Sequence, residues 1–259
     1  MESREFSPEY WSRVWEHIPL PQEVHPGDIP EIHRILISML PTGGRSFIEI
    51  GCAPGKWMAY FARQFGYSVS GLDYIEGACV KTRENLDRLS IDAQVHHADF
   101  FDFTSHPYDV VFSAGFIEHF EQPKAVVARL ARLCHPEGGF IITMIPSLEG
   151  LNRWISKTFR PRVAAGHFPI VLPELISLHE ACGLRTLYAN HIGGLHILPP
   201  IQKNRFAKAH PGMSFLLNLP FRVWNRAVTA TTAATGLYPH TGLVTRSILY
   251  IGQTGGGER

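Results

Sequence analysis

The 259-residue sequence predicts an α/β fold, doubly wound around a mostly parallel seven-stranded sheet, with helices on both faces and an inserted helical segment before the last strand. Three observations lead to this prediction. Residues 47–56 form an apolar run that ends at a glycine turn and opens a helix. Strand-like and helix-like segments then alternate to about residue 192. The apolar content of 45% is enough to build a sizeable core.

Residues 1–42 are expected to form an N-terminal helical cap segment. Apolar residues recur there at helical spacing in two places, around Trp11 and around Leu36. Four prolines interrupt the stretch between them: Pro19, Pro21, Pro26 and Pro30. The second apolar stripe is expected to pack on the sheet. The first stripe either covers the active site or has an ordinary core role.

Residues 43–192 and 242–253 are expected to form the core domain. Strands are predicted at about residues 46–51, 68–73, 93–97, 108–113, 140–145, 184–192 and 243–252. Helices are predicted between the first two strands, ending at Gly66, and at about residues 77–89 and 122–134. Residues 108–113 are almost continuously apolar, which is typical of a strand buried in a parallel sheet.

The glycine turn after the first strand carries the clearest ligand signal. Its spacing is Gly51-x-x-x-Gly55, and Glu49 lies two residues before the first glycine. A carboxylate there repels a pyrophosphate and suits a cationic ligand. Asp73 ends the second strand, where an acidic side chain can accept hydrogen bonds from ribose hydroxyls. The turn therefore predicts a nucleoside ligand that carries a positive charge.

This pattern resembles motifs I and II of the class I S-adenosylmethionine-dependent methyltransferases, in particular the small-molecule, type 11 group. Residues 98–100, 108–112 and 136–139 resemble later motifs of that family, in the same order. The resemblance implies S-adenosyl-L-methionine as cofactor and an antiparallel last strand. The cofactor-binding residues that it implies are Glu49, Gly51, Cys52, Ala53, Gly55, Asp73, Tyr74, Asp99, Phe100 and Ala114.

Two histidines are candidates for the base that removes a proton from a hydroxyl acceptor. His119 follows the fourth strand, at the carboxyl edge of the sheet where ligands bind. The Glu118-His119 pair is common in the resembled superfamily, including members without base catalysis, so a purely structural role stays open. His167 precedes a helix that flanks the acceptor pocket in the resembled stretch. Both are expected to be catalytic.

The acceptor pocket is expected to be apolar. Its predicted members are Tyr10, Trp11, Trp15, Phe116 and His196. Ubiquinone-biosynthesis O-methyltransferases, a related group, carry an extra glutamate three residues before Glu118 and use that cluster near a divalent metal. Gly115 occupies this position here. No metal site is therefore predicted.

Residues 193–241 are predicted to be an inserted lid or oligomerisation segment, because a connection of this length is usually functional. A helix from Met213 to Ala234, broken near Pro220, is expected within it. Its apolar face carries few charges, so it is expected to be buried. The face is defined by Phe215, Leu216, Leu219 and Val223. A lid over the acceptor pocket is favoured, while a homodimer contact and a membrane-surface or lipid-like contact stay open.

Bulk properties limit the partners. The net charge of +1 gives no footprint for nucleic acid, so a small-molecule acceptor is expected. Four cysteines without C-x-x-C spacing and a charged first stretch indicate a cytoplasmic protein without a signal peptide. No apolar run is long enough for a transmembrane segment. O-methylation in small-molecule or secondary metabolism is the leading expectation. The alternatives are N-methylation of an amino sugar or amine, a noncatalytic binding protein of the same fold, and a nicotinamide oxidoreductase.

Overall fold

A seven-stranded sheet forms the centre of the computed structural model, which describes residues 8–16, 18–159, 161–200 and 209–255. The strand order is β3-β2-β1-β4-β5-β7-β6. β7 runs antiparallel to both of its neighbours, and the other pairs are parallel. The strands are β1 (Ser46–Ile50), β2 (Ser68–Asp73), β3 (Ala93–His97), β4 (Val110–Ala114), β5 (Phe140–Pro146), β6 (Arg185–Ile192) and β7 (Ser247–Gln253). The predicted fold class is confirmed.

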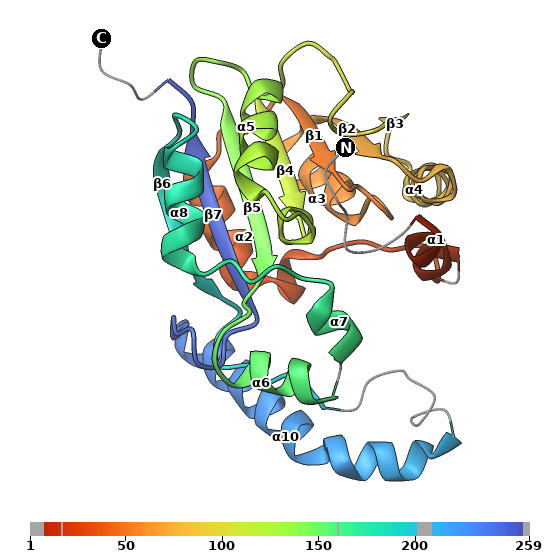
Figure 1. Ribbon diagram of the computed structural model, residues 1–259, viewed down its shortest axis with the longest axis vertical. Coiled ribbons are helices and arrows are strands. Elements are labelled where there is room, and N and C mark those ends of the chain that lie inside the picture. The colour runs from red at the N-terminus through yellow and green to blue at the C-terminus, as the bar shows by residue number, and fades with distance from the viewer. Residues whose placement is uncertain (1–7, 17, 160, 201–208, 256–259) are drawn as a thin grey trace.

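Helices cover both faces of this sheet (Figure 1). The α-helices are α1 (Pro8–Glu16), α2 (Pro30–Met39), α3 (Lys56–Phe65), α4 (Glu76–Arg88), α5 (Pro123–Leu133), α6 (Gly150–Phe159), α7 (Pro161–Ala165), α8 (Leu172–Glu180) and α10 (Pro211–Thr235). Two 3-10 helices are η1 (Pro26–Asp28) and η2 (Ile117–His119). The sheet separates two large apolar clusters, one with α2 and α3 and one with α5 and α8, and a third, small cluster consists of Ala53, Ile75 and Ala78.

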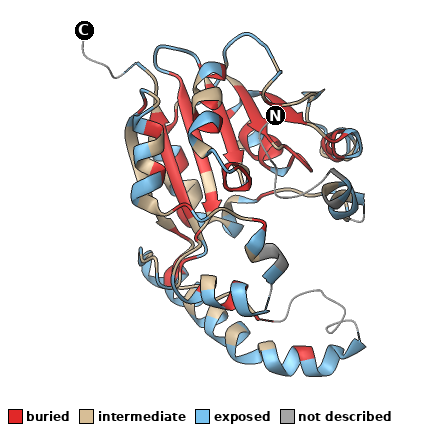
Figure 2. Ribbon diagram, in the orientation of Figure 1, coloured by how far each residue is buried: buried red, intermediate tan, exposed pale blue. Residues whose placement is uncertain are grey.

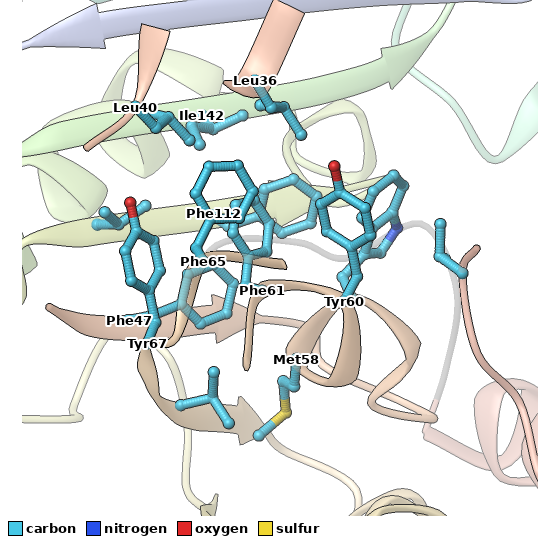
Figure 3. Packing of buried hydrophobic residues seen from close by; sticks show 14 of the residues in the cluster. Leu36, Leu40, Phe47, Met58, Tyr60, Phe61, Phe65, Tyr67, Phe112 and Ile142 are labelled. Carbon is cyan, nitrogen blue, oxygen red and sulfur yellow. The ribbon is translucent and has the colours of Figure 1, made fainter. Parts of the chain in front are cut away.

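Aromatic rings fill the first of these clusters (Figure 3). Phe47 of β1 stacks on Phe61 of α3 at a centroid distance of 4.5 Å, and Phe112 of β4 lies 6.0 Å from Phe47. Figure 2 shows the result, with buried residues concentrated in the strands. The end of β1 and the turn after it, which carry Glu49 and Gly51, are thus supported by closely packed aromatic side chains.

Three elements differ from the prediction. β4 begins at Val110, because Asp109 turns its carboxylate toward β1 and accepts a hydrogen bond from Ser46 N (2.9 Å). β7 begins at Ser247, because the preceding residues form a turn. The inserted helix is continuous through Pro220 and changes direction along its length (Figure 1). Proline removes a backbone hydrogen bond, but Pro220 is exposed and water can satisfy the carbonyl it leaves.

The described part of the chain contains no helix long and apolar enough to cross a membrane.

Candidate functional site

A cavity of about 340 Å³ opens at the carboxyl ends of β1, β2 and β4. This volume lies in the range of small-molecule sites, and the carboxyl edge is where open α/β sheets bind ligands. Its wall combines the first glycine turn, the end of β2, the segment after β4 and the helix α1. These segments are far apart in sequence, and the strand order of the sheet brings them together.

Glu49 contributes a buried carboxyl group to the cavity wall. Its side chain is 3% exposed, and burial raises the pKa of the carboxyl group well above its ordinary value. The positive charge of Lys56 and a hydrogen bond from the backbone of Met58, at the start of α3, oppose that rise. Among the described residues, Glu49 Oε2 has no hydrogen-bond partner. A cationic or hydrogen-bond-donating ligand group in the cavity would supply one.

The glycine turn has the backbone geometry that only glycine adopts readily. Gly51 has a φ of +70° and Gly55 a φ of +84°, both in the left-handed region. A Cβ atom on Gly51 would lie 3.1 Å from the Phe116 ring, which also lines the cavity. A Cβ atom on Gly55 would lie 3.0 Å from Thr82. A side chain at either position would therefore push a neighbour or fill the space beside the ligand site.

Asp73 lies at the end of β2 and is 7% exposed. Its Oδ1 accepts a hydrogen bond from the backbone N–H of Ile75 (3.0 Å), which fixes the carboxylate at the cavity wall next to Tyr74. Ala53, Phe100 and Ala114 also line the cavity. The structure thus brings together most of the residues expected to bind a nucleoside.

Cys52 and Asp99 differ from the expectation. The Cys52 side chain is fully buried. It packs so closely on Gly71 that no side chain would fit at that position. Asp99 is absent from the described cavity wall, although Ala98 and Phe100 line it. Its Oδ1 accepts a hydrogen bond from Phe101 N (2.9 Å), so the carboxylate stabilises its own turn. A direct side-chain contact with a ligand in the cavity is not supported at either position.

His119 ends η2 and faces the cavity. Its Nδ1 lies 2.9 Å from the carbonyl oxygen of Gly166, and its ring lies 4.7 Å from that of His167. Burial lowers the pKa of His119 to about 4, with a further lowering by His167, while hydrogen bonds to the backbone of Gly166 and Gly115 act in the opposite direction. His119 is therefore a neutral imidazole near pH 7.

Glu118 lies behind His119 with its side chain 1% exposed. Burial raises the pKa of its carboxyl group to about 8, and neither carboxyl oxygen has a hydrogen-bond partner among the described residues. One ligand atom from each of Glu118, His119 and His167 lies within 4.8 Å of the others. This arrangement has the donor types of a transition-metal site, although Gly115 replaces a carboxylate. The absence of a metal stays a prediction.

The acceptor side of the cavity is aromatic. Trp11 stacks on Trp15 with a centroid distance of 6.2 Å, and the Trp11 ring meets His119 edge-on at 5.3 Å. Both tryptophans and Phe116 line the cavity as expected. Tyr10 belongs to α1, but its side chain lies outside the described part of the structure.

His196 is not brought to the described cavity wall. It bridges two parts of the insertion instead, because its ring contacts the Gly193 carbonyl oxygen and lies 3.0 Å from Thr229 Oγ1 of α10. The prediction that it binds the acceptor is therefore not supported by its position. Its histidine side chain fixes the start of the insertion to the inserted helix.

Several wall residues were not predicted, among them Ile18, Phe120 and Met144. Met144 lies near the carboxyl end of β5, and Phe120 directly follows His119, so the rule that ligands bind at this edge could have identified both. Ile18 lies in an irregular stretch after α1, where the sequence has no pattern that indicates a ligand.

Family and relative comparisons agree with this geometry. Residues 47–138 match the family model described as "Methyltransferase domain". The chain is 30% identical, over 66% of its length, to a protein named ubiquinone biosynthesis O-methyltransferase from Thiobacillus denitrificans, of which it covers 69%.

Solved structures show the same fold at low sequence identity. One is a putative sarcosine dimethylglycine methyltransferase from Galdieria sulphuraria (TM-score 0.59, 14% identity, 95% of this chain and 97% of that one). Another is the mycolic acid cyclopropane synthase CmaA1 complexed with SAH and CTAB (TM-score 0.57, 17% identity, 88% of this chain and 84% of that one).

Proposed function

The chain belongs to the class I S-adenosylmethionine-dependent methyltransferases, and we propose that it methylates the hydroxyl group of a small, largely apolar acceptor. S-adenosyl-L-methionine is the cofactor, and its sulfonium centre supplies an activated methyl group. The protein's own contribution is to hold cofactor and acceptor in line and to accept the hydroxyl proton.

The cofactor end of the proposed site is built from Glu49, the Gly51–Gly55 turn and Asp73. Glu49 has a buried oxygen that lacks a partner, which suits the cationic portion of the cofactor. The bare backbone of Gly51 allows close approach, and Asp73, whose carboxylate is fixed at the cavity wall, is proposed to accept hydrogen bonds from the ribose hydroxyls. Tyr74 and Phe100 add apolar wall on either side.

The observation that carries the hydroxyl proposal is a neutral histidine on an aromatic wall. Among the described residues, the carboxylates that line the cavity are Glu49 and Asp73, both assigned to the cofactor. The acceptor end has His119 together with Trp11 and Trp15. An amine acceptor is a cation near pH 7 and would be expected to meet a carboxylate there. This composition therefore favours a hydroxyl on an apolar molecule.

His119 is proposed as the general base. A carbonyl oxygen only accepts hydrogen bonds, so neutral His119 donates to Gly166 when its proton is on Nδ1, and we propose this tautomer. The Nε2 atom then carries the lone pair that accepts the hydroxyl proton as the methyl group transfers. His167 is proposed to position this ring, since the two rings are in contact.

Residues 1–42 are proposed as the cap, because α1 supplies two aromatic residues of the acceptor wall.

A matched pair of acceptors tests the proposal. The enzyme is incubated with S-adenosylmethionine that carries an isotopically labelled methyl group and with a set of phenols and of benzylamines of matched size, which are cations near pH 7. We expect label in the methyl ether of a phenol, identified by mass spectrometry, and none in the N-methyl product of the matching benzylamine. Label that enters only the benzylamines would favour the amine alternative. Cofactor binding without transfer to any member of a broad acceptor library would favour the noncatalytic alternative.

Replacement of Asp73 tests the assignment of the cofactor end. A hydrogen bond to a charged acceptor contributes about 1.5–3 kcal/mol, so Asp73→Ala should weaken binding of S-adenosylhomocysteine roughly tenfold or more. Calorimetric titration measures the change. Asp99→Ala is the matched control and should have the smaller effect, because Asp99 stabilises its own turn. Equal affinity of the Asp73→Ala variant and the parent protein would remove Asp73 from the site.

A further inference from the structure

The inserted helix α10 exposes large apolar side chains, whereas a helix on the surface of a water-soluble protein ordinarily exposes polar ones. The side that packs on the rest of the chain is mostly polar, with Ser214, Asn225 and Thr232 buried or half-buried beside the half-buried Phe221 and Val228. The opposite side is apolar and exposed. Its exposed fractions are 55% for Met213, 65% for Leu216, 49% for Leu217, 61% for Val223 and 46% for Trp224. A surface helix ordinarily buries such a stripe and exposes its polar side.

The stripe runs along the first half of the helix, from Met213 to Trp224. Met213, Leu216, Leu217, Val223 and Trp224 follow the spacing that places residues on one helical face. The helix does not cover the cavity, because no α10 residue lies on the described cavity wall. Phe215, Leu216, Leu219 and Val223 are all exposed in this structure, so the favoured expectation of a lid over the acceptor pocket is not supported, while a contact with a second subunit or with lipid stays open. Figure 2 shows α10 as mostly exposed.

Polar contacts fix α10 in this orientation. Asn225 exchanges two hydrogen bonds with the backbone of Ile197, at 2.9 and 2.8 Å. Trp224 donates its indole N–H to the Leu195 carbonyl oxygen (2.8 Å). Asn152 of α6 contacts the same segment, residues 195–198. It donates a hydrogen bond to the His196 carbonyl oxygen and accepts one from the backbone N–H of Leu198. The helix is held through Asn225 and the indole N–H of Trp224, while Met213, Leu216, Leu217 and Val223 stay exposed.

Helix α6 packs on the same segment, residues 195–198, as α10 does (Figure 1), and it also carries exposed aromatic side chains. Its Trp154 is 59% exposed, and Phe159 at its end is 45% exposed. We name α6 and α10 together the α6–α10 lobe. Neither helix contains an aspartate or glutamate, while Arg153, Lys157, Arg222 and Arg226 supply positive charge. The surface of the lobe is thus apolar, aromatic and purely cationic.

We propose that the α6–α10 lobe binds the surface of an anionic lipid bilayer. Helices that lie in a bilayer interface combine an exposed apolar stripe, aromatic side chains and flanking Lys or Arg. A second copy of the chain would bring like charges together, whereas anionic head groups complement them. The apolar stripe of α10 enters the interface, and Arg222 and Arg226 lie at the level of the head groups. This inference does not depend on the acceptor chemistry.

Vesicle co-sedimentation of the full chain tests the proposal. Two preparations are compared, phosphatidylcholine alone and equal parts of phosphatidylcholine and phosphatidylglycerol. We expect binding to the anionic vesicles, weakened by added salt, and much less to the neutral ones. The double variant Arg222→Gln/Arg226→Gln should reduce anionic binding by more than about tenfold, since each cation contributes about a factor of five.

A second pair of variants separates the apolar stripe from the general effect of charge. Leu216→Glu/Val223→Glu should abolish binding. The matched control is Ile37→Glu/Val80→Glu, which introduces the same charge at side chains 44% and 54% exposed on α2 and α4. The control should bind as the parent does, and all variants should unfold at the parental temperature because the sites are exposed.

Three results would overturn the proposal. The first is no sedimentation of the parent chain with anionic vesicles. The second is equal loss of binding in the Leu216/Val223 and Ile37/Val80 variants. The third is analytical ultracentrifugation that shows a dimer which Leu216→Glu/Val223→Glu dissociates, because the stripe would then be a contact between copies.

Discussion

Replacement of Gly51 with valine is expected to abolish cofactor binding while leaving the fold intact. The Cβ atom would approach the Phe116 ring to 3.1 Å, and the branched side chain would drive that ring into the cavity that it lines. Overpacking of this kind costs about 1–3 kcal/mol, and the cost falls on the ligand-bound state, where the space is needed. This cost alone lowers the affinity for S-adenosylhomocysteine by about five- to 150-fold, and the loss of space for the ligand lowers it further. Calorimetry measures it directly.

Gly43→Val is the matched control for that variant. Gly43 has a φ of +78°, close to the +70° of Gly51, so both substitutions force a branched residue into the left-handed region. A Cβ atom on Gly43 meets no atom within 4 Å. The two variants should lose similar thermal stability, and only Gly51→Val should lose binding. Normal turnover by Gly51→Val would refute the assignment of the turn to the cofactor.

Replacement of His119 with glutamine is expected to lower kcat by about a hundredfold to ten-thousandfold, the range for loss of a general base. The glutamine amide can still donate to the Gly166 carbonyl oxygen, so the segment that His119 holds should keep its place. S-adenosylhomocysteine affinity should stay near the parental value. The surface variant His106→Gln serves as control. Parental kcat in His119→Gln would restrict His119 to a structural role.

The pH profile gives an independent readout of the same residue. The pKa of His119 is lowered from 6.5 to about 4, so the neutral, proton-accepting form persists as the pH falls through 6. The acid limb of kcat/KM that His119 causes should therefore lie below about pH 5, not near 6.5. The free energy of unfolding should also fall as the pH falls below about 6.5, because His119 in the unfolded chain then binds a proton that the folded chain does not bind until about pH 4. Thermal unfolding at each pH separates loss of fold from loss of the base.

The fold was predictable because local sequence patterns and tertiary environment agree in the core. The helix that carries Met58 and Phe65 ends at Gly66 as expected, where φ is +68°. The start of β4 was not predictable in this way. Tyr108 and Asp109 fit the strand pattern, but the hydrogen bond between Asp109 and Ser46 depends on a pairing 63 residues away. Such a contact leaves no periodic signal in the chain.

The cofactor end of the site was more predictable than the acceptor end. Glu49, Gly51 and Asp73 belong to one βαβ unit, in which spacing alone determines where each side chain lies. The acceptor wall combines α1, η2 and the end of β5, and only the tertiary fold brings them together. Asp99 shows the limit of motif reasoning, since its position matches the motif while its carboxylate turns to Phe101 N.

The insertion was predicted to bury its apolar face, and this inference assumed that the helix packs through apolar residues. α10 packs through Asn225 and its neighbours instead, so the periodicity correctly located an apolar stripe but could not show which way it faces. Only the positions of the packing partners, in the strip at residues 195–198, decide that orientation.

Calorimetric titration of the full chain with S-adenosylhomocysteine, and separately with NAD, tests the central claim that the cavity at Glu49, Gly51 and Asp73 is the cofactor site of a methyltransferase. We expect single-site binding of S-adenosylhomocysteine that Gly51→Val abolishes and Gly43→Val preserves, and no binding of NAD. Binding of NAD together with no response to S-adenosylhomocysteine would contradict it.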